Sequence, residues 1–341
     1  MQKAINVGRY GGRIQLSEVA YPKLKENQVL IEMAFAPVNP SDIYFAKGVY
    51  GIKKKLPAIL GFEGSGKIIQ SNVTDQSKKY QNQFLLNKNV ACMALEDPES
   101  GGSMAQFMAT SIDNIIVLND YAKLENYSSS FVNPVTAYGF LQRLKQLNSE
   151  SVLLNSANSA LGQMCIKLFK LHGIKTYAVV RNPVQKEKLY ELGVEKVFIY
   201  DAQSKNQKLN DQLFEIQEIL QNSKTSTFLD AVGGLSSSHL FSIMPKNSIM
   251  ISYGAFELKK FEIDPQQFIF QQKQIEGFWL NRYLEKLNEQ ERDEVYSYVL
   301  DNIDGIFKSN IYKIYNINDY SQAVIECWKT SGLGKTLLKI R

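Results

Sequence analysis

The segment from residue 151 to residue 173 joins an apolar run, a cluster of small side chains and an amphipathic stretch, and reads SVLLNSANSALGQMCIKLFKLHG. This pattern predicts a strand, a tight turn and a helix that packs on a sheet. Small residues in the turn would let the backbone approach a pyrophosphate at the helix N-terminus, where free N–H groups favour anions. Gly162 is the only glycine of the turn, so the GxGxxG pattern is not matched. The segment therefore predicts a dinucleotide-binding turn, and the alternative is a turn selected for packing alone.

The next strand-like run, at 175–180, is followed by Arg181 and Asn182. A site that prefers NAD usually carries an Asp or Glu here, which bonds the ribose hydroxyls. This chain has no acid at that point, and Arg181 offers a cation to the adenosine 2′-phosphate. The pattern favours NADPH, and the alternative is a solvent-facing arginine at a strand end.

The elements that would position these residues change in character along the chain. From about residue 150, apolar runs alternate with helical segments and read SVLLNSA, KTYAVVR, KVFIYD, TFLDAVGG and SIMISYG. Continuous apolar strands need helices over both faces, so this part predicts an α/β fold with a doubly wound parallel sheet. Earlier runs such as VLIEMAFA (29–36) and GSGKIIQ (64–70), broken by Pro, Gly, Asn and Asp, predict a mostly β region.

Chain length and the texture of the C-terminus suggest the domain organisation. At 341 residues the chain is too long for one ordinary core. We expect a mostly β domain over 1–125 and a dinucleotide-binding Rossmann domain over 126–282. The remainder, 283–341, opens with a charged helix-like stretch and closes with the strand-like TLLKI, so we expect it to return to the first domain.

Composition excludes several classes of protein. The net charge of +5 is spread along the chain with no basic tail, which argues against nucleic-acid binding. The three cysteines, Cys92, Cys165 and Cys327, form no CxxC pair, so neither a disulfide framework nor a cysteine zinc knuckle is expected and a reducing compartment is favoured. No apolar run approaches the roughly 20 residues of a membrane span.

Residues that could bind a catalytic zinc ion are scarce. Such a site needs three protein ligands and an open position. The chain has two histidines, His172 and His239, both in segments expected to form helices over the nucleotide-binding sheet. Phe62 in GFEGSG and Pro40 in NPSD stand where zinc-dependent alcohol dehydrogenases of this architecture carry a ligand His and a ligand Cys. We therefore expect chemistry without zinc.

An ordered series of motifs runs over nearly the whole chain: APVNPSDIYFAKGVYG, LPAILGFEGSG, VNPVTAY, NSANSALGQ, VVRN, DAVGGLSS, ISYGAF, IEGFWL and LGKTLLKI. In this series the chain resembles the mitochondrial trans-2-enoyl-thioester reductases, a zinc-free, quinone oxidoreductase-like family of the medium-chain dehydrogenase/reductase superfamily. The resemblance implies a GroES-like catalytic domain over 1–125. It also implies NADPH-dependent reduction of enoyl thioesters in type II fatty acid synthesis.

A tyrosine after NPSD donates the proton in that family, and the matching residue is Tyr50 in KGVYG. Hydride transfer to the β-carbon of an enoyl thioester leaves an enolate, which a phenol of pKa about 10 can protonate. The alternative is one of 18 tyrosines packing in a loop. The resemblance further implies cofactor contacts from Asn133, Asn158, Ser159, Ala160, Leu161, Arg181, Asn182, Tyr253, Gly254, Ala255, Phe256, Phe278, Trp279, Leu280, Asn281 and Lys335.

Two departures from the family affect what can be expected. Ala160 replaces a glycine common in the family's turn, which adds a methyl group near the pyrophosphate. The family's acyl-pocket lining is not closely reproduced around GGSMAQF (101–107), so the acyl chain length stays open. Lys53, Lys54 and Lys55 follow Tyr50 and are expected either in a solvated loop or as a site that attracts an acidic carrier or CoA phosphates.

Partners, location and rival functions follow from the resemblance as expectations. The substrate would be an enoyl thioester on acyl carrier protein or CoA, in a homodimer formed through the edge of the nucleotide-binding sheet. The location would be mitochondrial, with a cytoplasmic one as alternative. The stretch before Glu18 contains no acid and resembles a mitochondrial presequence, but it overlaps an expected first strand at 4–7, so its cleavage would remove part of the fold. The rivals are an NADPH quinone or enone oxidoreductase and an inactive reductase retained as a structural subunit of a larger assembly.

Overall fold

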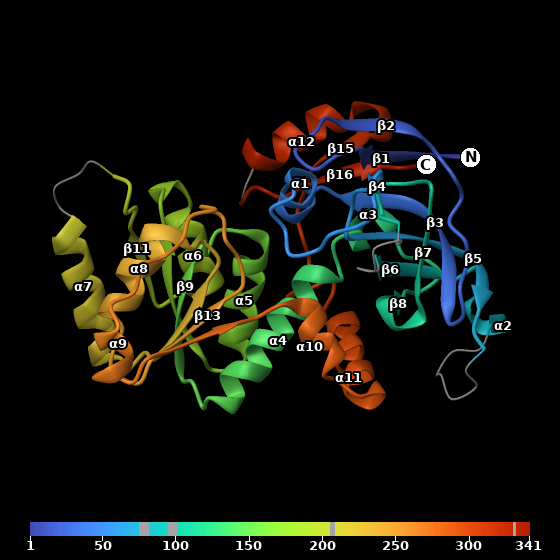
Figure 1. Cartoon of the computed structure of the whole chain (residues 1–341). Helices are drawn as coiled ribbons and strands as arrows, with labels where there is room; N and C mark the ends of the chain where they lie inside the picture. Colours follow the sequence, from blue (N-terminus) through green and yellow to red (C-terminus); the bar gives the residue numbers. More distant parts are fainter. Residues whose placement is uncertain (75–81, 95–100, 205–208, 330–331) are drawn as a thin grey trace. The chain divides into compact units, whose positions relative to one another are not determined.

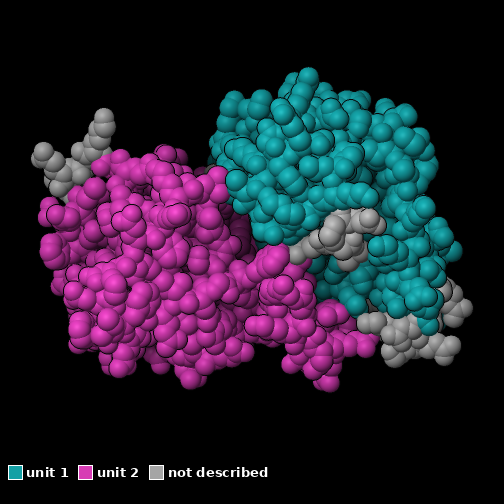
Figure 2. All heavy atoms as spheres, viewed as in Figure 1, with its two compact units in different colours: residues 1–134, 296–341 teal, residues 135–295 magenta. Residues whose placement is uncertain are grey.

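The computed structural model describes residues 1–74, 82–94, 101–204, 209–329 and 332–341, and divides into two compact units (Figures 1 and 2). Unit 1 comprises residues 1–134 and 296–341, and unit 2 comprises residues 135–295. Both limits fall inside helices, α4 (Val132–Gln146) and α11 (Glu289–Asp301). Each unit is a sheet structure with its own apolar core.

Unit 1 contains two β-sheets. A three-stranded sheet has the order β2-β1-β4, and a larger one has the order β15-β16-β3-β5-β6-β8, with β7 paired to β3. The strands are β1 (Gln2–Val7), β2 (Ile14–Val19), β3 (Gln28–Pro37), β4 (Ala58–Ile59), β5 (Glu63–Asn72), β6 (Asn89–Met93), β7 (Phe107–Ser111), β8 (Ile115–Val117), β15 (Ile311–Asn316) and β16 (Lys335–Lys339). The helices of unit 1 are α1 (Pro40–Lys47), α2 (Asn82–Leu85), α3 (Leu124–Tyr127) and α12 (Tyr320–Lys329), with 3₁₀ turns at Ile112–Asn114 and Ile317–Asp319.

Strand β3 shows why this part of the sequence forms sheet. Its residues Val29, Ile31 and Met33 are fully buried, while the residues between them are partly exposed. A strand turns successive side chains to opposite faces, so this alternation places one face of β3 on the core. The C-terminal strand β16 pairs antiparallel with β3, which brings the end of the chain into the sheet of the N-terminal part.

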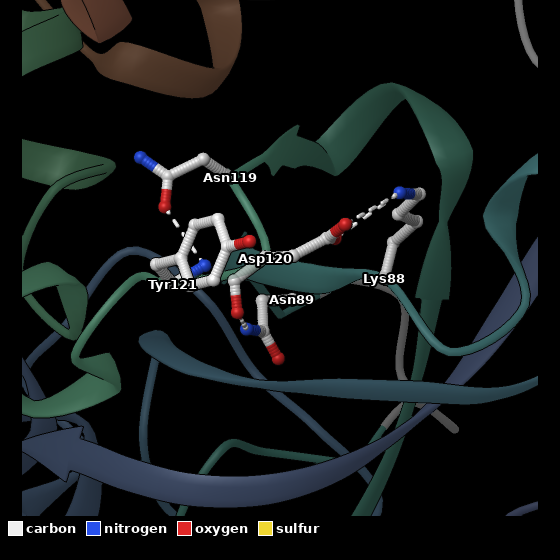
Figure 3. A network of polar contacts seen from close by, with 5 residues as sticks. All are labelled: Lys88, Asn89, Asn119, Asp120 and Tyr121. Carbon is white, nitrogen blue, oxygen red and sulfur yellow. Dashed lines mark hydrogen bonds and ion pairs between the residues drawn. The ribbon is translucent and has the colours of Figure 1, made fainter.

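Polar contacts on the surface of unit 1 fix the chain after β8 (Figure 3). The ammonium group of Lys88 lies 3.1 Å from a carboxylate oxygen of Asp120, and the Asn89 amide donates to the Asp120 carbonyl at 3.4 Å. The Tyr121 N–H donates to the Asn119 side chain at 3.1 Å. An exposed ion pair of this kind contributes roughly 0–1 kcal/mol, so these contacts mainly set the path toward α3.

Unit 2 is built on one six-stranded parallel sheet of order β11-β10-β9-β12-β13-β14. Its strands are β9 (Ser151–Asn155), β10 (Lys175–Val180), β11 (Lys196–Ile199), β12 (Thr227–Asp230), β13 (Ile249–Ser252) and β14 (Gln274–Gly277). Its helices are α5 (Ala160–Leu171), α6 (Lys186–Leu192), α7 (Leu209–Asn222), α8 (Gly234–Ile243), α9 (Gln266–Ile269) and α10 (Leu280–Glu285), with a 3₁₀ turn at Pro183–Gln185.

The strand order confirms the predicted doubly wound sheet. It corresponds to the order 3-2-1-4-5-6 of dinucleotide-binding folds, with β9 as the first strand. Figure 1 shows α7 and α8 on one side of this sheet and α4 and α5 on the other. Because both faces are covered, β9 is buried along its whole length, as the continuous apolar run predicted. Among the described residues, no helix is both long and apolar enough to cross a membrane.

A buried lysine fixes the edge of this sheet. Lys273, directly before β14, is 2% exposed, and its ammonium group donates to the carbonyl oxygens of Phe241 and Ser242 at 2.9 and 3.0 Å. It also donates to the side chain of Gln267 at 2.6 Å. The last carbonyl groups of a helix have no partner within it, so Lys273 caps the end of α8.

Stability should report the ionisation of Lys273. Burial lowers the pKa of Lys273 from 10.5 to about 8. Between about pH 8 and pH 10.5 this lysine is therefore protonated in the unfolded chain and largely deprotonated in the native protein. Stability should therefore rise as the pH increases from about 8 toward 10.5, by at most about 1.4 kcal/mol per pH unit. Urea unfolding at a series of pH values would show this rise in the wild type and its loss in Lys273→Met. Parallel curves for the two proteins would contradict it.

Candidate active site

The residues predicted to bind the cofactor divide between the two units. Fourteen of the sixteen lie in unit 2, and Asn133 and Lys335 belong to unit 1. Tyr50, the predicted proton donor, also lies in unit 1. In unit 2 the predicted residues follow the carboxyl ends of β9, β10, β13 and β14. Because all the strands are parallel, these positions share one edge of the sheet, where open α/β folds bind ligands.

The turn after β9 forms the start of a twelve-residue helix, α5, whose first turn contains no acidic residue. Ser159 is the N-cap, and its hydroxyl accepts a hydrogen bond from the Gly162 N–H at 3.1 Å. A β-carbon at Gly162 would lie 2.5 Å from the carbonyl oxygen of Ala157, so only glycine fits there. Residues 158–161 are partly exposed. By helix geometry the N–H groups of Ala160 and Leu161 have no acceptor within the helix, which suits a phosphate.

The end of β10 carries an exposed arginine. Arg181 forms no ion pair with the residues that the structure describes, and it is exposed like Asn182 beside it. The Asn182 side-chain oxygen accepts from the Val184 N–H at 2.9 Å and caps the following 3₁₀ turn. The turn therefore holds Asn182 in place and leaves its amide donor and the guanidinium available to an anion.

A buried carboxylate that sequence analysis did not single out holds two neighbouring strand ends together. Asp230, at the end of β12, is fully buried and accepts from the Asn155 side chain at 2.5 Å and from the Val232 N–H at 3.1 Å. The Asn155 oxygen in turn accepts from the Ala231 N–H at 2.7 Å. Asp230 and Asn155 therefore form hydrogen bonds that join the ends of β12 and β9, and these bonds fix the backbone beneath the nucleotide-binding edge.

Aromatic side chains cluster where β13 and β14 end. Phe140 of α4 lies between Tyr253 and Phe278, with both ring centroids 4.7 Å away, and the Tyr283 ring lies 5.6 Å from that of Phe278. A β-carbon at Gly139 would lie 2.6 Å from the Phe278 ring, so the absence of a side chain there makes room for the ring. Burial raises the pKa of Tyr253 well above 10, which keeps its hydroxyl protonated.

The other predicted residues of this edge differ in exposure. Trp279 is 36% exposed and Phe256 41%, whereas Leu280 is 8% exposed and packs inward at the start of α10. Asn281 is partly exposed, as is Gly254, whereas Ala255 is exposed. Because the Leu280 side chain is buried, this residue could contact a ligand only through its backbone.

A bidentate ion pair holds β14 to α4 within unit 2. The guanidinium of Arg143 donates to both carboxylate oxygens of Glu276, at 2.7 and 2.8 Å. Each side chain is 32% exposed, and parallel N–H···O bonds of this kind fix orientation as well as distance. Tyr283 adds a hydrogen bond of 2.6 Å to Gln142 on the same helix. These contacts fix the strand that leads into Phe278.

In unit 1, Tyr50 lies in the loop that follows α1. Gly48 ends α1 in the left-handed conformation, with φ of 75°, where a β-carbon would also meet the Tyr10 side chain at 2.7 Å. The partly buried Tyr50 ring packs on Phe62, with centroids 5.2 Å apart. Tyr10 anchors the loop, because its hydroxyl donates to the Lys54 carbonyl and accepts from the Lys54 N–H, at 2.9 and 2.7 Å.

The expectation of three solvated lysines after Tyr50 is wrong for Lys54. Lys54 is 5% exposed, and its ammonium group donates to the Gly101 carbonyl at 2.7 Å. Lys53 is exposed but bonds the Gly48 carbonyl and lies over the Tyr10 ring, and Lys55 is exposed. Lysine stems bury readily while the charged end finds acceptors, so this segment secures the loop rather than presenting three free charges.

A buried polar network in unit 1 joins residues that sequence analysis did not connect. The Asn39 amide donates to Glu63 at 2.9 Å and its oxygen accepts from the Lys335 ammonium at 2.5 Å. The second oxygen of Glu63 accepts from the Val132 N–H at 2.9 Å, at the start of α4, and from that of Phe131 at 3.4 Å. The partly exposed Asn133 follows directly.

Asp42 completes this network from the first turn of α1. It accepts from the Asn39 N–H at 2.7 Å and is 1% exposed. Burial raises the pKa of Asp42 to about 7; the Asn39 N–H lowers the pKa, the charge of Glu63 raises it further and that of Lys335 lowers it. The signal in the sequence was a charged residue inside an apolar strand, as Glu63 is in LGFEGSG, but nothing in the sequence identified its partners.

The positions relevant to zinc have other neighbours. Phe62 is 8% exposed and packs against Phe45 and Tyr50, and Pro40 opens α1. His239 on α8 shares a hydrogen bond of 2.6 Å with the Tyr200 hydroxyl, and His172 ends α5. No three potential ligands from His, Cys, Asp and Glu come together among the described residues. The expectation of chemistry without zinc remains a prediction.

Comparison with known families agrees with this two-part organisation. Residues 25–120 match the alcohol dehydrogenase GroES-like domain, and residues 160–299 match the zinc-binding dehydrogenase family. Pro40 and Phe62 lie in the first of these ranges. The second covers most of the parallel sheet of unit 2.

Individual relatives narrow the family further. The chain is 29% identical over 286 residues to the mitochondrial enoyl-[acyl-carrier-protein] reductase of Arabidopsis thaliana, which covers 82% of this chain and 71% of the relative. It is 29% identical over 324 residues to the protein of that name from Dictyostelium discoideum, covering 93% and 87%. Among solved structures, a Mesorhizobium loti protein assigned as an NADPH:quinone reductase superposes with a TM-score of 0.85 at 25% identity, covering 99% and 98%. The chain therefore belongs to the medium-chain dehydrogenase/reductase superfamily and, within it, is similar to the mitochondrial enoyl-[acyl-carrier-protein] reductases.

Proposed function

We propose that this protein reduces trans-2-enoyl thioesters, carried on CoA or acyl carrier protein, to saturated acyl thioesters with NADPH. The observation that carries the proposal is Tyr50, a tyrosine on an anchored loop of the GroES-like unit, in a chain whose relatives share the name enoyl-[acyl-carrier-protein] reductase. A phenol in that position gives the site a proton donor that does not depend on a metal ion.

The proposed chemistry assigns one proton transfer to Tyr50. NADPH, when bound, supplies the hydride that the β-carbon of the substrate accepts, and the thioester becomes an enolate. Tyr50 then gives its hydroxyl proton to the α-carbon, and water restores the phenol. A side chain acting as general acid in this way typically contributes about 10²–10⁴-fold to the rate.

The described residues fit NADPH rather than NADH. Arg181 would pair with the 2′-phosphate, supported by the amide of Asn182, and the N–H groups of Ala160 and Leu161 would hold the pyrophosphate. Tyr253, Gly254, Ala255, Phe256, Phe278, Trp279, Leu280 and Asn281 would line the nicotinamide, with Asn133 and Lys335 contributed from unit 1. No acid follows β10 to bond a free ribose hydroxyl. We include in the proposal that no zinc ion takes part.

A homodimer formed through β14 and a mitochondrial location belong to the same proposal. Strand β14 is the last strand of the sheet of unit 2, so one row of its backbone groups has no partner strand among the described residues. Ile269 and Phe270, which precede it, are 65% and 69% exposed. If two copies paired at this edge, each would cover the unpaired backbone groups of β14 and the exposed side chains of Ile269 and Phe270 in the other. The location rests on the names of the relatives.

The test is the loss of NADPH absorbance with trans-2-enoyl-CoA, enoyl-acyl carrier protein and a panel of quinones and enones. Turnover of thioesters in preference to quinones is the expected result. The fold shared with the Mesorhizobium loti protein favours a quinone or enone oxidoreductase as the second candidate, which preferential quinone turnover would select. No turnover of any substrate, together with purification in a large complex without bound nucleotide, would favour an inactive structural subunit.

A further inference from the structure

The buried network of Asn39, Glu63 and Lys335 assigns each polar atom a single role. The Asn39 amide is the donor toward Glu63, and the Asn39 oxygen is the acceptor toward Lys335. One Glu63 oxygen accepts from Asn39, and the other accepts from backbone N–H groups at the start of α4. A change of donor or acceptor at Asn39 or Glu63 must therefore disturb both the contact with Lys335 and the contact with the start of α4.

Burial makes this assignment strict. Glu63 is fully buried and Asn39 is 7% exposed, so water cannot readily replace a lost partner. The backbone around Glu63 is also fixed: the Ser103 hydroxyl donates to its carbonyl, and a β-carbon at Gly64 would lie 2.6 Å from the Phe35 carbonyl oxygen. A polar group left unpaired in such a place loses its partner without gaining one from water, so the network has one low-energy arrangement.

We infer that Asn39 and Glu63 are positioning residues that fix two cofactor-binding groups of unit 1, Lys335 and Asn133, relative to each other. Lys335 is held through its ammonium group, and Asn133 through the first turn of α4 beside Val132. The inference rests on the proposed NADPH-dependent function, and adds that these two contacts behave as one element although 202 residues separate them.

A reciprocal exchange of the two side-chain types tests the coupling. In Glu63→Gln the new amide group must face either the Asn39 amide or the backbone N–H groups, so two donors meet. In Asn39→Asp two carboxylates meet instead. The double variant Asn39→Asp with Glu63→Gln restores a donor opposite every acceptor, retains an acceptor for Lys335 and leaves the formal charge of the network unchanged.

Two measurements on the full chain follow each variant. The Kd for NADPH, from its fluorescence on binding, should rise at least about tenfold in each single variant and return to within about threefold of wild type in the double variant. Hydrogen–deuterium exchange in the peptide that contains Phe131 and Val132 should quicken in both single variants and recover in the double variant.

Thr110→Val provides a matched control for lost stability. Thr110 is fully buried in unit 1, and its hydroxyl donates to the Met93 carbonyl at 2.6 Å, not to Asn39, Glu63 or Lys335. Met93 is the cross-strand partner of Glu63, so this control also tests the backbone beside the network. The control should lower the melting temperature and leave the Kd for NADPH unchanged. If Thr110→Val weakens NADPH binding as much as Glu63→Gln does, the effect is general destabilisation and the inference fails.

The remaining outcomes are also decisive. If the losses of NADPH binding free energy in the two single variants simply add in the double variant, the two residues act independently and the inference is overturned. If the single variants do not fold but the double variant folds and binds NADPH, the inference is supported. If the double variant also fails to fold, the inference is overturned. A wild-type protein that does not bind NADPH would remove the proposed function, and amide exchange would still show whether Asn39 and Glu63 hold the start of α4.

Discussion

Tyr50→Phe is expected to lower kcat for enoyl-thioester reduction by about 10²–10⁴-fold and to leave the Kd for NADPH unchanged. Phenylalanine keeps the ring that packs on Phe62 and removes only the hydroxyl. The enolate would then have to take its proton from water, which is neither positioned nor held at the α-carbon. Stopped-flow measurement of NADPH oxidation, with fluorescence titration of NADPH, gives both quantities.

Tyr10→Phe separates the chemistry of Tyr50 from the anchoring of its loop. This variant loses both hydrogen bonds to Lys54 but retains the Tyr50 hydroxyl. We expect a smaller loss of rate and a lower melting temperature. An equal loss of rate in the two variants would mean that loop order rather than proton donation limits turnover. Quinone reduction, which needs no carbon protonation by Tyr50, should survive Tyr50→Phe.

Arg181→Ser is expected to raise the Kd for NADPH about 10–100-fold while leaving that for NADH nearly unchanged. A hydrogen bond to a charged group contributes about 1.5–3 kcal/mol, and each 1.4 kcal/mol is a factor of ten in affinity. Only NADPH carries the 2′-phosphate that Arg181 would bind. Titration of both nucleotides at two salt concentrations measures the difference and its electrostatic part.

Lys175→Ser is the matched control for the loss of a positive charge. Lys175 lies at the other end of β10, exposed, with its ammonium group 3.8 Å from Glu195. Its removal changes the net charge as much as Arg181→Ser does but should leave both affinities unchanged. Equal weakening by the two substitutions would assign the effect to the general field of the protein and remove Arg181 from the phosphate site.

The fold was predictable where the pattern of side chains is local. The alternating residues of β3 and the continuous apolar run of β9 are properties of a few neighbouring residues, and both predicted strands are present. The limits between the two units are different, because they fall within α4 and α11. A helix that continues from one unit into the next has no Gly- or Pro-rich linker to mark the limit.

The site was predictable only in part. The small residues around Ser159 and the position of Arg181 after a strand are sequence signals, and the structure places both at the same edge of the sheet. The partners of Glu63 are not signalled, because Asn39 and the start of α4 come from distant parts of the chain. The role of Lys54 was also hidden, since burial of its stem depends on where Gly101 lies.

The contact between Gly139 and Phe278 has a consequence for the evolution of the family. The nearest atom of the Phe278 ring lies only 2.6 Å from where a β-carbon at position 139 would be, so the two positions compete for one volume and cannot both be large. Among homologous sequences, any larger residue at position 139 should accompany a smaller or differently shaped one at position 278. An alignment in which bulky side chains occur at both positions together would show that the ring can be seated elsewhere.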